Sequence, residues 1–222
     1  MKTRSLLVTV LAFAACSGPA LAPTPGAFGF DDEITGWRVD STGGRGPHAT
    51  WAVRTDRGAV SPPQVMALTV VNHLDEDRYN LHWSSTVKFQ DGRLAVAVRA
   101  DEGTVDQGGG PMWRVQDANN YYLCRYNPLE ANYRVYVVKD GVRRQLATAL
   151  VETDPRAWHR LEAEHAGTRI TCWLDGEKLL EADDGTIPEA GGVGLWTKAD
   201  ARTSFDDFVM TPAAKAASDA KK

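Results

Sequence analysis

The chain has 222 residues, of which 43% are hydrophobic and 24% are charged, and its formal net charge at pH 7 is −4. This length and apolar content suit one domain with a substantial core. Lysine and arginine are scattered among the acidic residues, and no basic stripe is present, so the composition argues against a nucleic-acid partner.

Residues 1–22 have the plan of a secretory signal peptide. A basic start, residues 1–4, precedes the apolar run of residues 6–15, which is too short to span a bilayer as a stable helix. We therefore expect the mature chain to be exported.

Two cleavage positions compete within this segment. Residues 13–16, "FAAC", resemble a bacterial lipoprotein box with Cys16 as the lipidated residue, whereas residues 20–22, "ALA", resemble an ordinary signal-peptidase site before Pro23. We favour the lipoprotein reading, in which Ser17 matches the outer-membrane sorting pattern. This predicts a periplasmic or outer-membrane lipoprotein that meets the membrane only through its lipid anchor, and the alternative is a secreted protein.

Residues 23–27 begin a Pro/Gly/Ala spacer, and the pattern then changes to short strand-like runs separated by turns. The runs recur every 8–12 residues or so, which is typical of an antiparallel sandwich or barrel, and no stretch keeps a helical apolar period. The sequence predicts one all-β domain over residues 28–211 and a disordered tail over residues 212–222. The expected strand-like runs are "WAVRTD", "QVMALTVVN", "HWSSTVKF", "RLAVAVRADEG", "PMWRVQDANN", "YYLCRYNP", "YRVYVVKDG", "RRQLATAL", "WHRLEAEHAG", "RITCWLDG", "EKLLEADDG", "GGVGLWTK" and "TSFDDFVM".

Two hairpins and two cysteines complete the local expectations. Asp140–Gly141 and Asp175–Gly176 each separate two strand-like runs, and Asp-Gly tolerates the positive φ of a tight hairpin turn. Cys124 and Cys172 lie inside strand-like runs, so we expect two separate buried cysteines although an oxidising compartment would permit a disulfide. No CxxC or Cys/His cluster indicates a zinc site.

Three long segments together carry a family resemblance. They are "DQGGGPMWRVQDANNYYLCRYNPLEANYRVYVVKDGVRRQLA", "WHRLEAEHAGTRITCWLDGEKLLEADDGTI" and "GGVGLWTKADARTSFDDFVM". They resemble the concanavalin A-like, laminin-G-like jelly-roll proteins, above all the bacterial 3-keto-disaccharide hydrolase-type (family 16 glycoside hydrolase-like) domains. The resemblance implies a two-sheet antiparallel jelly-roll sandwich whose concave face binds or cleaves a glycan.

Alternation along each strand predicts which side chains share a face. Trp113 and Val115 are expected on one face, and Trp196 shares a face with Lys198. Guanidinium, amide, carboxylate and aromatic groups are those that bind sugars, although the arginines could equally serve to knit the sheet together. The residues expected to bind the glycan are Trp113, Arg114, Tyr122, Arg125, Asn127, Glu130, Arg134 and Trp196.

The catalytic signals are sparse. The E-x-D-x-x-E strand of family 16 hydrolases is missing, and the pair Glu162 and Glu164 is best explained as a solvated strand face. Glu130 is the only glutamate within the dense segment of residues 106–136, so it is the candidate general acid or base. Asp101 and Asp106, in "DEGTVDQGGG", are the candidates for calcium, although a plain acidic turn is favoured, and no other cofactor is expected.

Three functions follow from these observations. We favour a domain that recognises a carbohydrate ligand on its concave face. The first alternative is a glycoside or 3-keto-glycoside hydrolase of the same fold, in which Glu130 is catalytic. The second alternative is a structural envelope module in which the arginines stabilise the sheet.

Overall fold

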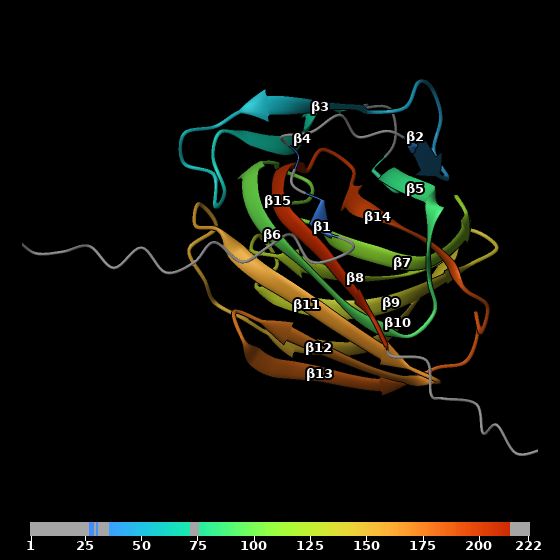
Figure 1. The fold of residues 1–222 in the computed structure, drawn as a ribbon. Coiled ribbons are helices and arrows are strands. Elements are labelled where there is room, and N and C mark those ends of the chain that lie inside the picture. The colour runs from blue at the N-terminus through green and yellow to red at the C-terminus, as the bar shows by residue number, and fades with distance from the viewer. Residues whose placement is uncertain (1–26, 29, 31–35, 72–75, 214–222) are drawn as a thin grey trace, which may run out of the picture.

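The computed structural model describes residues 27–28, 30, 36–71 and 76–213, and these form two stacked antiparallel sheets (Figure 1). The eight-stranded sheet has the order β13-β12-β11-β6-β15-β4-β3, with β1 pairing β15, and the seven-stranded sheet has the order β10-β9-β8-β7-β14-β5-β2. The prediction of an all-β jelly-roll sandwich is therefore confirmed. Among the described residues, no helix is long and apolar enough to cross a bilayer. The signal-peptide, Cys16 and spacer predictions for residues 1–26, and residues 214–222 of the predicted tail, lie outside the described residues.

The chain crosses between the two sheets several times, and β7–β10 and β11–β13 are runs of consecutive strands within one sheet. The eight-stranded sheet contains β1 (Ala27–Phe28), β3 (Thr50–Thr55), β4 (Gln64–Val70), β6 (Gly92–Glu102), β11 (His159–Ala166), β12 (Arg169–Leu174), β13 (Glu177–Asp183) and β15 (Arg202–Pro212). The seven-stranded sheet contains β2 (Trp37–Thr42), β5 (Tyr79–Phe89), β7 (Gly110–Asp117), β8 (Asn120–Asn127), β9 (Asn132–Lys139), β10 (Val142–Leu150) and β14 (Gly191–Lys198).

Apolar side chains fill both faces of the seven-stranded sheet. Its inner face packs against the eight-stranded sheet to form the main core, which includes Tyr122, Cys124 and Val135. Its outer face carries a second buried cluster. A sheet that is buried on both faces needs apolar residues at successive positions, which explains the nearly continuous apolar run of β8. The members of the second cluster are Leu81, Trp83, Met112, Val115, Tyr121, Leu123, Tyr136, Val138 and Trp196.

The outer face of the seven-stranded sheet is concave because the sheet is strongly curled. Four strands separate β10 from β5 in the sheet order, so a flat sheet would hold these two strands roughly 24 Å apart. The guanidinium carbon of Arg143 on β10 nevertheless lies 5.0 Å from the ring centre of Tyr79 on β5. Thr42 on β2 likewise donates to the carbonyl of Ala118 and contacts the hydroxyl of Tyr121 on β8.

An irregularity in β7 changes the predicted distribution of its side chains. Arg114 has a φ of 48°, and the pairing of β7 with both neighbours shifts register around it. Trp113 consequently lies in the main core while Val115 lies on the concave face, so the prediction that they share a face is wrong. An inserted residue of this kind breaks the two-residue alternation on which that prediction depends.

Arg114 is a buried junction that joins three loops at one end of the sandwich. Its Nε donates to the carbonyl of Gln90, its Nη1 to the carbonyl of Ile187, and its Nη2 to Asp91 and to the carbonyl of Gly167, all at 2.8–3.0 Å. The side chain is only 1% exposed. The planar guanidinium fork therefore satisfies acceptors from the β5–β6, β11–β12 and β13–β14 connections at once.

Replacing Arg114 should destabilise the fold. We expect Arg114→Ala to lower the free energy of unfolding by about 3–5 kcal/mol, because it leaves buried acceptors unpaired. Urea denaturation followed by tryptophan fluorescence measures this change. The matched control is Arg169→Ala, which removes a 60%-exposed arginine from a surface pair with Glu181 and should cost about 1 kcal/mol or less. Equal losses in both variants would contradict the account.

The local predictions are confirmed at the two hairpins, and the cysteines are buried and unbridged as expected, but their side chains are in contact rather than separate. Asp140, Gly141, Asp175 and Gly176 all adopt positive φ, at the turns between β9 and β10 and between β12 and β13. The two cysteines, Cys124 and Cys172, are free thiols buried in the main core. Burial raises the pKa of Cys172 well above its usual range, which keeps this thiol protonated.

Candidate functional site

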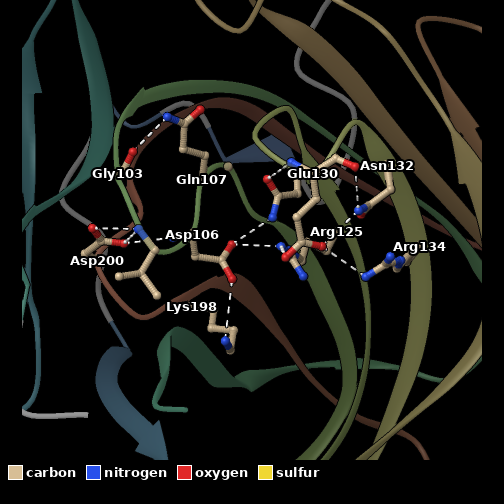
Figure 2. Close-up of polar contacts among 12 residues, drawn as sticks. Gly103, Asp106, Gln107, Arg125, Glu130, Asn132, Arg134, Lys198 and Asp200 are labelled. Atoms are coloured by element: carbon tan, nitrogen blue, oxygen red, sulfur yellow. Dashed lines mark hydrogen bonds and ion pairs between the residues drawn. The ribbon is translucent and has the colours of Figure 1, made fainter. Parts of the chain in front are cut away.

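A group of charged side chains lies at one end of the concave face, and we call it the charged cluster. Figure 2 shows how its members converge from different parts of the chain. Asp106 comes from the loop before β7, Glu130 from the β8–β9 turn, and the cations come from three strands. The charged cluster consists of Asp106, Arg125, Glu130, Arg134 and Lys198.

Arg125 links the two carboxylates of the cluster. Its Nη2 lies 2.9 Å from Oδ1 of Asp106 and 3.4 Å from Oε1 of Glu130. Arg134 holds the other oxygen of Glu130 at 3.1 Å, and Asn132 donates to the same oxygen at 2.9 Å. The Asp106–Arg125 pair is buried, whereas the side chains of Glu130 and Arg134 are 41% and 30% exposed. The cluster therefore has a rigid buried base and an accessible rim.

The loop that carries Asp106 is fixed by hydrogen bonds and by glycine. The carboxylate of Asp200 accepts from the backbone N–H groups of Thr104 and Asp106 at 2.7 and 2.9 Å. Gly108 has a φ of 70°, and a Cβ added there would lie 2.2 Å from the carbonyl oxygen of Tyr126. The glycine run thus lets this loop lie against β8, so the close approach that it permits is to the protein's own backbone.

The two carboxylates of the cluster have pKa values shifted in opposite directions. Burial raises the pKa of Asp106 to about 6, although Arg125 and Lys198 act to lower it. Glu130 is less buried, and its contacts with Asn132, Arg125 and Arg134 outweigh the smaller desolvation, so its pKa lies below the usual range. At pH 7 both groups are ionised, and below about pH 6 Asp106 takes up a proton first.

Some polar atoms of the cluster have unused hydrogen-bonding capacity. Oδ2 of Asp106, Nε of Arg125 and Oδ1 of Asn132 are buried and have no hydrogen-bond partner in the described part of the chain. Buried polar atoms are normally paired. Because these three atoms are buried, contact with another molecule falls to the exposed side chains of Glu130 and Arg134.

An aromatic floor continues the concave face beside the cluster. It consists of Tyr79, Tyr136 and Trp196, and the guanidinium of Arg143 lies over all three rings, 4.6–5.7 Å from their centres. Trp196 is fully buried and donates from Nε1 to the hydroxyl of Tyr121 at 3.2 Å. The rings of Trp196 and Tyr136 are buried beneath Arg143, so they support this guanidinium and present no open face on which a sugar could stack, contrary to the role predicted for Trp196.

The structure separates the predicted site residues into two groups. Arg125, Asn127, Glu130 and Arg134 come together in or beside the charged cluster, where Asn127 donates to Asp106 at 3.1 Å, and Trp196 lies on the same concave face.

The other predicted site residues lie inside the protein. Trp113 is in the main core and donates to Nδ1 of His165 at 3.0 Å, and Tyr122 donates to Asp184 at 2.6 Å. Arg114 is the loop junction described above. None of these three contacts the charged cluster among the interactions of the described residues, because β7 is irregular and the side chain of Tyr122 points to the inner face of β8.

The two calcium candidates, Asp101 and Asp106, bind different partners in the structure. Asp101 on β6 accepts from Arg99 at 2.8 Å and from Ser204 at 2.5 Å, whereas Asp106 pairs with Arg125. Within residues 27–28, 30, 36–71 and 76–213, no group of three or more His, Cys, Asp or Glu side chains is arranged to hold a metal ion.

Sequence reasoning missed Asp106 as a partner of Arg125, and it missed Arg143 and Tyr79 altogether. The shared face of Trp196 and Lys198 was a usable signal for β14. No local signal could place Arg143 over Tyr79, because that contact depends on the curl of the whole sheet.

Comparisons with known proteins support the fold. No protein-family model and no curated protein sequence matches the chain. Among solved structures, carbohydrate binding module CBM66 from Bacillus subtilis is similar at 20% identity and a TM-score of 0.60, over 78% of this chain and 94% of that one. Cellulose induced protein Cip1 is similar at 16% identity and a TM-score of 0.60, over 83% of this chain and 96% of that one. A native glycosidic hydrolase is similar at 13% identity and a TM-score of 0.54, over 88% and 99%. At these identities the likeness shows the fold that the chain shares with them.

The titration of Asp106 tests the electrostatics of the cluster. NMR of the side-chain carboxyl carbon should give a midpoint near pH 6. Glu130→Gln should lower this pKa, because the charge of Glu130 raises it, and Lys198→Met should raise it. The control Glu181→Gln, on the other sheet, should leave it unchanged.

The same shift has a consequence for stability. The pKa of folded Asp106 lies above the ordinary value of 3.8, so this carboxyl favours the folded state most below about pH 4. That contribution is lost as the pH rises through 6. A midpoint near 4 in the folded protein would contradict the assigned burial of this group.

Proposed function

We propose that this chain is an exported carbohydrate-recognising domain that binds a glycan on the concave face of its seven-stranded sheet. The observation that carries the proposal is the accessible rim of the charged cluster, Glu130 and Arg134, held in place by the buried Asp106–Arg125 pair. A rigid set of donors and acceptors of this kind can bond sugar hydroxyls without first being ordered. The fold shared with a carbohydrate binding module supports it.

A hydrolase of the same fold is the second candidate. Asp106 and Glu130 both contact Nη2 of Arg125, and their pKa values are shifted apart, which is a pattern found in acid/base pairs. Asp106 is 2% exposed and its free oxygen is buried, so it cannot reach a glycosidic oxygen without a rearrangement. Glu130 alone faces solvent, and its lowered pKa suits a base or a nucleophile better than an acid. Binding is therefore favoured over turnover.

The export proposal is independent of this face. It rests on the basic start and apolar run of residues 1–22, and the mass of the mature protein distinguishes a start at lipidated Cys16 from a start at Pro23.

A binding and turnover screen on plant, bacterial and 3-keto glycosides tests the function. We expect binding without hydrolysis, weakened about tenfold or more by Glu130→Gln, since a hydrogen bond to a charged group contributes roughly 1.5–3 kcal/mol. The matched control is Glu181→Gln, because Glu181 is similarly exposed, at 45%, and pairs with an arginine on the other sheet.

Three other results would change the assignment. Turnover that Glu130→Gln abolishes would make the protein a hydrolase. Equal effects of Glu130→Gln and Glu181→Gln would move the binding site away from the charged cluster. No binding and no turnover on any glycan would contradict the proposal and favour a structural module.

A further inference from the structure

Arg143 places its guanidinium on the concave face, where it has no carboxylate partner among the described residues. It extends from the edge strand β10 over the rings of Tyr136, Tyr79 and Trp196, at 4.6, 5.0 and 5.7 Å. Its Nη1 is buried and has no hydrogen-bond partner, and among the described residues it forms no ion pair. The next residue, Arg144, is by contrast paired with Asp184 at 2.6 Å. Cation–π contacts hold Arg143 in position but leave its N–H donors unused.

Lys198 lies on the same face of the sheet as this guanidinium. It follows Trp196 by two positions on the same face of β14, and its cross-strand neighbour is Tyr79. Its Nζ lies 3.7 Å from Asp106 and 3.9 Å from Asp77, beyond hydrogen-bonding distance of either carboxylate. Arg143 and Lys198 therefore flank the same two aromatic rings, and both have donors to spare.

The charges of the concave face do not cancel. The carboxylates Asp106 and Glu130 are matched by Arg125 and Arg134, which contact them at 2.9–3.4 Å. Asp77, near Lys198, is 95% exposed, so solvent screens its charge. Arg143 and Lys198 therefore give this part of the face an excess of positive charge. Because the neighbouring aromatic rings are apolar, a bound anion is attracted there more strongly than in water.

We propose that Arg143 and Lys198 form an anion subsite, and that the glycan bound on this face carries a carboxylate or sulfate group. The inference rests on the proposed function and names the class of its ligand. Arg143 is only partly buried, so its guanidinium can bond an oxygen of such a group, and stacking on the rings fixes it in advance. Glu130 and Arg134, at the exposed rim of the charged cluster, would bond hydroxyls of the same glycan.

Calorimetry with pairs of glycans that differ only in charge tests the subsite. The probes are oligogalacturonate with its methyl ester, and a sulfated glycan with its desulfated form. We expect one charged member to bind roughly tenfold to a hundredfold more tightly than its neutral counterpart, as for a hydrogen bond to a charged group. The pair that shows this preference identifies the anion as a carboxylate or a sulfate.

Variants then assign the effect to these two residues. Arg143→Gln and Lys198→Met should each remove most of the preference, and Arg143→Lys should retain part of it. Arg169→Gln removes one exposed positive charge from β12 on the other sheet and should leave the preference unchanged. Near-ultraviolet circular dichroism checks that each variant is folded. If Arg143→Gln does not fold, the comparison of Lys198→Met with the wild-type protein, on oligogalacturonate and its methyl ester, still tests the subsite.

The outcomes separate this inference from the proposed function. Neutral glycans that bind as tightly as charged ones would overturn the anion subsite and leave glycan binding intact. The anion subsite would also be overturned if the charge preference survived in both Arg143→Gln and Lys198→Met, or if Arg169→Gln also removed it. Either result would show that the anionic glycan is attracted by the overall charge of the protein. Binding to no glycan, charged or neutral, would overturn both.

Discussion

The curl of the seven-stranded sheet is the constraint on which the rest of the structure depends. It brings β10 within contact of β5 across four intervening strands, and it buries a second apolar cluster on the face opposite the main core. Polar groups at the bottom of such a face are shielded from water on most sides. The raised pKa of Asp106 is one result, and the fixed position of Arg143 over three rings is another.

The arginines of the densest sequence segment are of two kinds. Arg114 is enclosed by loop carbonyls at the end of the sandwich and stabilises the fold, whereas Arg125 and Arg134 orient the carboxylates of the concave face. Arg114 therefore serves the fold, whereas Arg125 and Arg134 belong to the surface for which we propose glycan binding. Buried ion pairs contribute little net stability, and we therefore assign the Asp106–Arg125 pair to the proposed binding surface.

Turns and the faces of regular strands could be predicted from the sequence, because both depend on residues that are close together along the chain. Asp-Gly turns identified two hairpins, and alternation placed Trp196 with Lys198 on one face of β14, opposite Val193 and Leu195. It failed for β7, where the positive φ of Arg114 interrupts the alternation and sends Trp113 into the core. The strand β2 was not predicted, because "WRVDST" has only two apolar residues. Contacts such as Asp106 with Arg125 and Arg143 with Tyr79 depend on register and curvature, which a single sequence does not specify.

The most direct test of the account follows the indole N–H signals of the tryptophans by NMR while an acidic oligosaccharide is added. Trp196 lies under Arg143 on the concave face, whereas Trp158 donates to the carbonyl of Gly58 and Trp113 donates to His165 in the core. We expect the Trp196 signal to move in proportion to binding while those of Trp158 and Trp113 stay in place. A shift of Trp158 with no change at Trp196 would place the ligand elsewhere and contradict the central claim.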